Sequence, residues 1–214
     1  MRIALVGATG MIGQRILNEA LSRGHQVIAI ARDPAKVPPR PNLEIRAGDV
    51  MKPETLIPAI ATTDVLVSSC SPPRDDPRQA IESVRTLSEA VATAAKTGNH
   101  SLRLLMVGGA GSLEIAPGLQ VVDSPNFPEA SKTIALAHRD ALAALRKAPI
   151  NWTYFSPAGL IQPGARTGKY RTGNEQLVTD QKGESRISAE DYAVAMIDEI
   201  ENPRFIRQRF TAAY

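Results

Sequence analysis

The feature that most constrains this chain is a set of three glycines near its start, in the stretch MRIALVGATGMIGQRIL. Gly7, Gly10 and Gly13 stand where an apolar strand, predicted over residues 3–6, gives way to a helix predicted over residues 11–21. A glycine costs a helix about 0.5–1 kcal/mol relative to alanine, so this pattern needs a physical reason. A strand, a glycine turn and a helix in this order are typical of a nucleotide-binding unit.

Each glycine would have its own role in such a turn. Gly7 would permit the tight turn, Gly10 would let the backbone approach a pyrophosphate, and Gly13 would let the helix pack close to the sheet. The N–H groups at the start of the helix would bind the negative charge. The alternative is a glycine-rich turn without a ligand. In this context we predict a cofactor site that includes Gly7, Thr9, Gly10, Met11, Ile12 and Gly13.

Short apolar runs alternate with helical patterns along the rest of the chain. The runs predict strands at residues 27–31, 43–45, 65–69, 102–107, 152–155 and 210–213, the last at an edge of the sheet. Helices are predicted at residues 54–60, 79–96, 131–147 and 190–200, with Gly24 and Gly98 as stop signals and Ser188 as a cap. This alternation indicates an α/β fold: a doubly wound, Rossmann-like parallel sheet with helices on both faces.

The length of 214 residues suits one domain, and 43% hydrophobic residues can supply its core. We expect a single NAD(P)-binding domain over residues 1–214, with a small C-terminal substrate region. Two long segments rich in Gly and Pro, residues 109–130 and 157–188, follow the carboxyl ends of predicted strands. Such sheets bind ligands at those ends, so both segments are predicted to face the substrate.

Composition excludes several classes of protein. The net charge of +3 comes from a mixed surface without a run of Lys and Arg, so nucleic acid is not an expected partner. The single cysteine, Cys70, permits no intrachain disulfide and no cysteine-based metal site. The chain shows no signal peptide and no stretch of about 18 apolar residues. We therefore expect a cytoplasmic monomer or homodimer that binds neither metal nor membrane.

The second predicted strand ends where the ribose of an adenine nucleotide would lie. An acidic residue there would hold the ribose hydroxyls of NAD, whereas an arginine pairs with the 2′-phosphate of NADP. Arg32 therefore favours NADP, and the adjacent Asp33 leaves NAD open as the alternative. Asp49 would accept a hydrogen bond from the adenine amino group or serve as a turn or cap residue. Val50, beside it, is included in the predicted cofactor site.

The fourth predicted strand ends in Ser69, Cys70 and Ser71, which we place beneath the cofactor, near the nicotinamide ribose. Cys70 is expected to be a small packed residue rather than a nucleophile, because no neighbouring feature in the sequence would lower the pKa of its thiol. Pro72 follows and is predicted to line the substrate pocket.

The string GATGMIG (residues 7–13) resembles the nucleotide loop of extended and atypical short-chain dehydrogenases. Members that act on alcohols and sugars carry Tyr-x-x-x-Lys, in which the tyrosine is the acid/base. None of the four tyrosines here has a lysine four residues later; they are Tyr154, Tyr170, Tyr192 and Tyr214. Proton transfer to an alcohol or ketone by that route is therefore not expected.

Further stretches resemble the NADH-flavin reductase family, an atypical branch of the short-chain dehydrogenases that is similar to the biliverdin reductase B type. They are VGGAGSL (107–113), NWTYFSP (151–157), TGKYR (167–171) and ESRISAEDYA (184–193). Two positions depart from the pattern. Family members often have a tyrosine near Ser131, and the biliverdin reductase B type has a histidine where Ala158 stands. A proton donor supplied by the protein is therefore in doubt.

The resemblance implies hydride transfer from a nicotinamide cofactor to a small-molecule electron acceptor such as a flavin or quinone. The proton can then come from solvent, so the protein mainly supplies orientation. We expect Ser112 to bind the carboxamide or the acceptor as the catalytic residue, although it would alternatively cap its own loop. The residues expected around the nicotinamide are Gly108, Gly109, Pro157, Ala158 and Gly159; those of the acceptor pocket are Pro72, Gly111, Phe127 and Tyr170.

His138 and Lys132 are expected to be ordinary helix residues, the first on the surface or satisfied and the second solvated. Two functions remain from the sequence. The first is an NADPH-dependent reductase of a flavin or quinone-like acceptor; the alternative is a non-catalytic protein that senses NADP(H). A sugar epimerase is disfavoured by the missing Tyr-x-x-x-Lys dyad.

Overall fold

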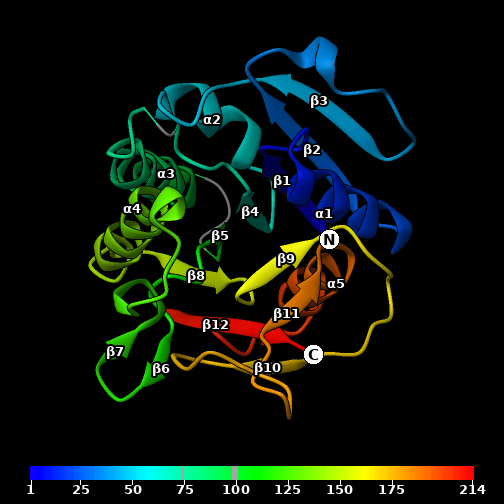
Figure 1. The fold of residues 1–214 in the computed structure, drawn as a ribbon. Coiled ribbons are helices and arrows are strands. Elements are labelled where there is room, and N and C mark those ends of the chain that lie inside the picture. Colours follow the sequence, from blue (N-terminus) through cyan, green and yellow to red (C-terminus); the bar gives the residue numbers. More distant parts are fainter. Residues whose placement is uncertain (74, 98–100) are drawn as a thin grey trace.

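The structure is a computed structural model that describes residues 1–73, 75–97 and 101–214. Within these residues, the main sheet has eight strands in the spatial order β10-β12-β8-β5-β4-β1-β2-β3 (Figure 1). All neighbouring strands pair in parallel except β10, which is antiparallel to β12. The predicted parallel α/β sheet is therefore confirmed.

The elements have the following bounds. The main sheet contains β1 (Arg2–Val6), β2 (Gln26–Ala31), β3 (Leu43–Ala47), β4 (Val65–Ser68), β5 (Arg103–Val107), β8 (Asn151–Ser156), β10 (Arg171–Gly173) and β12 (Gln208–Ala213). Two small sheets are formed by β6 (Glu114–Ala116) with β7 (Leu119–Gln120) and by β9 (Leu160–Gln162) with β11 (Arg186–Ser188). The helices are α1 (Met11–Ser22), α2 (Pro53–Ile60), α3 (Gln79–Thr97), α4 (Glu129–Leu145) and α5 (Ala189–Glu201), with short 3-10 helices at Pro34–Lys36 (η1) and Val121–Asp123 (η2).

Different helices cover the two faces of the sheet. α1 and α5 pack side by side on one face, and α2, α3 and α4 cover the other (Figure 1). The alternation along β1 produces both cores: Ile3 and Leu5 are buried with α1 and α5, whereas Ala4 and Val6 are buried with α2, α3 and α4. Because both faces are covered, the central strands are mainly apolar, as the sequence shows.

The structure differs from the sequence prediction at the last strand. β12 was expected at the edge of the sheet, but it lies between β8 and β10 and pairs with both. β10 has only three residues, Arg171–Gly173, and none of them is apolar, so no hydrophobic pattern marks it. The strands of the two small sheets have only two or three residues each, so they are too short for a pattern to predict them. Gly98, the predicted stop signal of α3, lies outside the described residues.

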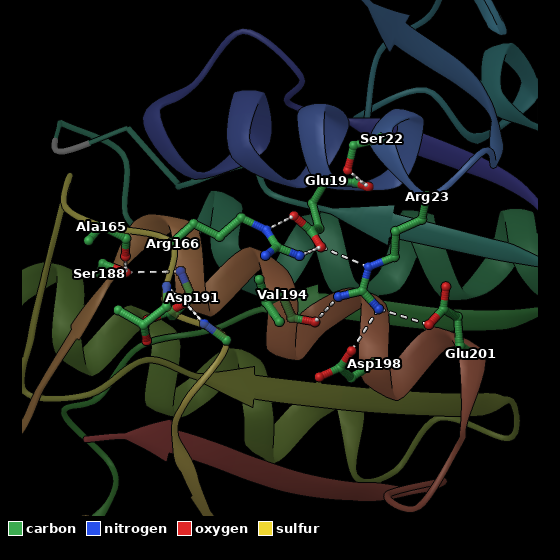
Figure 2. A network of polar contacts seen from close by, with 12 residues as sticks. Glu19, Ser22, Arg23, Ala165, Arg166, Ser188, Asp191, Val194, Asp198 and Glu201 are labelled. Carbon is green, nitrogen blue, oxygen red and sulfur yellow. Dashed lines mark hydrogen bonds and ion pairs between the residues drawn. The ribbon is translucent and has the colours of Figure 1, made fainter.

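Residues 163–170, called the strap below, bind both helices of the α1–α5 layer. The Arg166 guanidinium donates hydrogen bonds of 2.7 and 2.8 Å to Glu19 of α1, which also accepts one of 2.7 Å from Arg23 (Figure 2). Asp191, in the first turn of α5, is fully buried and accepts hydrogen bonds from Thr167 and from the Gly168 N–H. The strap therefore holds a fixed path across the two helices.

Ser188 caps α5 as predicted, because its Oγ accepts a hydrogen bond of 2.9 Å from the Asp191 N–H. The same hydroxyl donates to the carbonyl of Ala165 in the strap at 2.7 Å (Figure 2). Among the described residues, no helix is both long enough and apolar enough to cross a membrane.

Candidate cofactor site

The predicted cofactor residues lie at the carboxyl ends of neighbouring parallel strands. In the spatial order β3-β2-β1-β4-β5-β8, these ends carry Asp49, Arg32, the glycine turn, Cys70, Gly109 and Ala158. From β1 the following strands β2 and β3 are added on one side, whereas β4, β5 and β8 are added on the other. The strand order therefore reverses between β1 and β4, and doubly wound sheets bind ligands at such a point. The topology therefore brings residues from both halves of the chain to one edge, with the glycine turn at its centre.

The glycine turn is closely packed at two of its three glycines. Gly7 has φ of +81°, which L side chains rarely adopt, and a Cβ there would lie 2.7 Å from Ser69 Oγ. A Cβ on Gly13 would lie 2.0 Å from the carbonyl oxygen of Gly7, so α1 approaches β1 too closely for any side chain. At Gly10, by contrast, the nearest atom would be 3.4 Å away, and this residue is exposed. Only Gly10 leaves space for a side chain or a ligand.

The start of α1 keeps its backbone donors available. Gly10 is the N-cap residue, it provides no side-chain cap, and the first turn of α1 contains no acidic residue. The first N–H groups of a helix have no intrahelical acceptor, and the positive end of the helix dipole favours an anion there. This arrangement suits a pyrophosphate.

Ser69 holds the turn in place from β4. Its hydroxyl lies 3.0 Å from the carbonyl oxygen of Val6 and 3.1 Å from that of Gly7. The side chain therefore ties the end of β4 to the end of β1 beneath the turn. Its contacts show a structural role; Ser71, two residues later, is exposed.

The two candidate ribose contacts at the end of β2, Arg32 and Asp33, have different surroundings. Asp33 accepts a hydrogen bond of 3.2 Å from the Ala35 N–H and caps η1, and its carboxylate lies 3.7 Å from Lys36. Arg32 is exposed and forms no hydrogen bond or ion pair with another described residue. The arginine is therefore free to meet an anionic ligand, whereas the aspartate already has a role in the loop.

Asp49 and Cys70 flank the same end of the site. The Asp49 carboxylate accepts a hydrogen bond of 3.0 Å from the Met51 N–H, so the turn role considered from the sequence is present. Val50, beside it, packs against the core under α2, α3 and α4. Burial raises the pKa of the Cys70 thiol to about 11, with Arg32 opposing the shift and Asp49 adding to it. The thiol is therefore protonated at neutral pH, as expected for a packed cysteine.

The glycines after β5 allow close contact with β8 and α4. A Cβ on Gly108 would lie 2.1 Å from the ring of Tyr154, and one on Gly109 would lie 2.9 Å from the Cβ of His138. The Tyr154 hydroxyl donates a hydrogen bond of 2.9 Å to the carbonyl of His138. Burial lowers the pKa of His138 to about 4, so the imidazole is neutral at pH 7. Burial also raises the pKa of Tyr154, which keeps its proton.

Ser112, the predicted catalytic residue, lies inside the protein. It is 3% exposed, and its Oγ accepts a hydrogen bond of 2.8 Å from the buried Arg209. Arg209 also pairs with Glu175. The hydroxyl therefore contacts a buried arginine, and its contact with the carboxamide or the acceptor stays a prediction.

The residues predicted to form the acceptor pocket have different surroundings in the fold. Tyr170 donates a hydrogen bond to Asp198, which also binds Arg23 at the C-terminal end of α1. α1 starts at the glycine turn and runs to the opposite edge of the sheet, so Tyr170 lies away from the cofactor site. Gly111 is buried, with a Cβ position 2.7 Å from Ala135. Pro72 and Phe127 are half-buried. An acceptor pocket formed by these four residues stays a prediction.

The loop after β8 begins with two buried residues, Pro157 and Ala158. Gly159 is exposed, but its N–H donates a hydrogen bond of 3.0 Å to Ser185 Oγ. The contacts of Ser185 and Arg209 could not be predicted from the sequence, because the partners of both lie far away along the chain. No group of three or more His, Cys, Asp or Glu side chains that could hold a metal occurs among the residues described.

A parallel sheet in this strand order, with a glycine turn at the reversal point, defines a Rossmann-like dinucleotide-binding protein. Within that class, the chain belongs to the NAD(P)H-binding family, which residues 7–203 match.

Several solved structures share the whole fold. A protein of Burkholderia pseudomallei, provisionally named an exported protein, is 47% identical and covers 100% of both chains, with a TM-score of 0.90. One from Bacteroides thetaiotaomicron, provisionally named an epimerase, is 39% identical, with a TM-score of 0.88 and coverage of 100% of this chain and 96% of that one. A Streptococcus pneumoniae protein, provisionally named an NADH-flavin reductase, is 31% identical, with a TM-score of 0.87 and coverage of 100% and 99%.

Proposed function

We propose that the protein is an NADPH-dependent reductase that transfers a hydride to a flavin or a quinone-like acceptor. One observation carries this proposal: the polar side chains near the expected nicotinamide are already committed to the fold. Tyr154 is buried and protonated, Ser112 binds Arg209, and His138 is neutral. Such a site suits an acceptor that takes its proton from water, whereas reduction of an alcohol-forming carbonyl needs a positioned acid.

NADPH, when bound, would supply the hydride, and the chain would supply orientation. The start of α1 would bind the pyrophosphate, and Arg32 would pair with the 2′-phosphate. The glycines after β5 and the loop of residues 157–159 would form the walls around the nicotinamide. Asp49 and Val50 would lie toward the adenosine side, and Cys70 would lie beneath the cofactor, near the nicotinamide ribose. The reaction consumes NADPH, the oxidised acceptor and one proton, and it yields NADP⁺ and the reduced acceptor.

The names of the relatives point in different directions. The Streptococcus pneumoniae protein supports a flavin as the acceptor. The name of the Bacteroides thetaiotaomicron protein suggests an epimerase, but this chain has no Tyr-x-x-x-Lys sequence for that chemistry. The proposal keeps the expected cytoplasmic location and a monomer or homodimer as the working state.

A second candidate function is a non-catalytic sensor of NADP(H). The position of Ser112 favours it, because the hydroxyl predicted to be catalytic is buried and bonded to Arg209. A sensor would bind the cofactor with the same glycine turn and Arg32 but would not turn over.

The first experiment titrates the purified protein with NADPH and NADH and follows nicotinamide fluorescence. FMN and menadione are then added, and NADPH oxidation is followed at 340 nm. Tight NADPH binding with acceptor-dependent oxidation supports the reductase. Tight binding without oxidation by either acceptor would move the conclusion to the sensor, and the absence of binding would contradict both.

A further inference from the structure

A cavity of about 700 Å³ lies beside the small β9–β11 sheet, outside the predicted cofactor groove. One wall is the β9–β11 sheet, and the opposite wall is the start of the strap. Apolar groups line much of it, and they are Leu160, Pro163, Ala165, Ile187 and Tyr214. Cavities of about 300–1,000 Å³ with mainly apolar walls are typical of small-molecule sites.

The strand pairing fixes which side chains face this cavity. β9 and β11 are parallel, with Leu160 opposite Arg186 and Gln162 opposite Ser188. Because side chains alternate along a strand, these four residues share one face of the small sheet, and all four line the cavity.

The strap wall is held by bonds that a ligand would not need to disturb. Ser188 Oγ donates to the Ala165 carbonyl, and the Gly164 N–H donates a hydrogen bond of 2.7 Å to Glu190. A Cβ on Gly164 would lie 3.0 Å from the Cβ of Ser188, so the strap and β11 approach closely there. The cavity is therefore a preformed feature of the fold.

One end of the cavity adjoins the loop that is expected to cover the nicotinamide. Gly159 belongs to that loop, and the next residue, Leu160, lines the cavity. Ser185, another lining residue, accepts the Gly159 N–H at Oγ and the Leu160 N–H at its carbonyl oxygen, at 3.0 and 2.9 Å. A ring placed in the cavity would thus begin beside the loop that is expected to cover the nicotinamide.

The chemistry of the walls indicates what binds. Leu160 is 51% exposed, an apolar surface that a flat ring system would cover. The Ser185 and Ser188 hydroxyls are already bonded to the backbone, so the walls favour apolar contact over polar recognition. Arg186 stands at the rim with 58% of its side chain exposed, 3.6 Å from Glu184, and is available to an anionic group.

We infer that this cavity binds the planar ring system of the electron acceptor. Arg186 then pairs with an anionic group on the acceptor, such as the phosphate of FMN. The inference rests on the proposed reductase function and names a site for the ring system of the acceptor.

The test begins with Leu160→Trp, which fills the cavity from an exposed position and so should fold normally. We expect the Kd of oxidised FMN, measured by flavin fluorescence in the presence of NADP⁺, to rise at least about tenfold, equivalent to about 1.4 kcal/mol. The Kd of NADPH should stay unchanged. Leu119→Trp is the matched control, because Leu119 is 39% exposed on the remote β6–β7 hairpin. Equal FMN affinity in the two variants overturns the inference.

Arg186→Ala tests the anionic contact separately. We expect it to weaken FMN about two- to fivefold at low salt, as for an exposed ion pair, and to leave riboflavin unaffected. The loss should disappear at high salt because exposed charges are screened. Equal weakening of FMN and riboflavin would overturn the role of Arg186.

Measurements of FMN binding and of NADPH oxidation distinguish a failure of the cavity proposal from a failure of the proposed reductase function. If the parent oxidises NADPH with FMN but Leu160→Trp has no effect on FMN, the reductase stands and the cavity is excluded. If FMN binds in a Leu160-dependent manner without NADPH oxidation, the cavity stands as a flavin site and the reductase is excluded. A shift from dimer to monomer in Leu160→Trp, measured by light scattering without loss of FMN binding, would show that a second copy occupies the cavity and would also overturn the inference.

Discussion

The carbonyl oxygen of Gly7 lies 2.0 Å from the point that a Cβ of Gly13 would occupy. Ser69 Oγ is 2.6 Å from the same point and lies within hydrogen-bonding distance of the Gly7 carbonyl. The turn, the start of α1 and the end of β4 therefore meet at one place that tolerates no side chain. The glycine spacing in the sequence reflects this packing as well as the approach of a ligand.

Gly13→Ala should therefore destabilise the protein itself. Inserting a methyl group into a packed site typically costs about 1–3 kcal/mol, and urea unfolding should show a loss of that size. Gly10→Ala is the control, because its nearest neighbour would be 3.4 Å away, and it should unfold within about 0.5 kcal/mol of the parent. Equal stability of the two variants would contradict the packing role of Gly13.

Gly10→Glu should remove NADPH binding while the fold stays intact. The site has space for a side chain, but the carboxylate would repel a pyrophosphate at the start of α1. Gly10→Gln has nearly the same shape without the charge. We expect the Kd of NADPH for the glutamate variant to exceed that for the glutamine variant by at least about tenfold at low salt. A folded glutamate variant with parental NADPH affinity would refute the proposed pyrophosphate site.

Arg32→Ala should discriminate between the two cofactors. Hydrogen bonds to charged groups contribute about 1.5–3 kcal/mol, so NADPH should bind about ten to a hundred times more weakly. NADH lacks the 2′-phosphate, and its affinity should change little. Both are measured by nicotinamide fluorescence, with Asp33→Ala as the neighbouring control. If NADPH and NADH lose affinity equally, Arg32 does not bind the 2′-phosphate.

Cys70→Ala should retain NADPH binding and turnover. With a pKa of about 11, only about one thiol in a thousand is ionised at pH 8. Alkylation by iodoacetamide at pH 8 should therefore be much slower in the folded protein than in urea, and its rate should rise steeply toward pH 10. Rapid alkylation of the folded protein at pH 7 would show that the thiol is more acidic than its burial indicates.

Glu19→Gln should make the stability less dependent on acid. Hydrogen bonds from Arg166, together with those from Arg23, hold the pKa of Glu19 below its ordinary value of 4.5 although burial opposes this shift. A carboxylate with a lowered pKa stabilises the fold above its unfolded pKa, and that stabilisation disappears as the pH falls through the folded pKa. The variant should lose about 1–3 kcal/mol at pH 7 and progressively less below pH 4.5.

Urea unfolding at pH 7 and at pH 3.5 measures this difference. Glu129→Gln serves as the control, because the Glu129 side chain is 87% exposed and only pairs loosely with Lys132 at 3.7 Å. A loss of equal size for Glu19→Gln at both pH values would show that its carboxylate charge does not stabilise the strap.

The sequence predicted the part of the fold that depends on local patterns. The strands β1, β2, β4 and β5 are mainly apolar runs, β3 and β8 contain shorter apolar patterns, and the helices between them have clear periodicity, so their places were correct. Gly13 was correctly predicted to bring α1 close to the sheet, because a glycine at the start of a helix indicates that there is no room for a side chain. Short strands without apolar residues, such as Arg171–Gly173, carry no such pattern.

Side-chain roles that depend on distant partners could not be predicted in the same way. Ser112 looks like a catalytic serine in its own sequence, but its partner Arg209 comes from the last strand. Tyr170 is the last residue of the strap, which leaves the carboxyl edge of the sheet. Its hydrogen bond to Asp198 places the end of the strap beside α5. The path of a long loop is fixed by tertiary contacts, which residue spacing does not contain.

The order of the strands also determines what a bound dinucleotide would do for the protein. The edge between β3 and β8 is assembled from strands separated by more than half of the sequence, and β1 and β4 pair at its middle along the whole of β4. A cofactor lying along this edge would hold the two halves of the sheet together. The resistance of the protein to heat or protease would then increase with the fraction of protein that has cofactor bound. Cellular lifetime would thereby follow the concentration of the dinucleotide that binds.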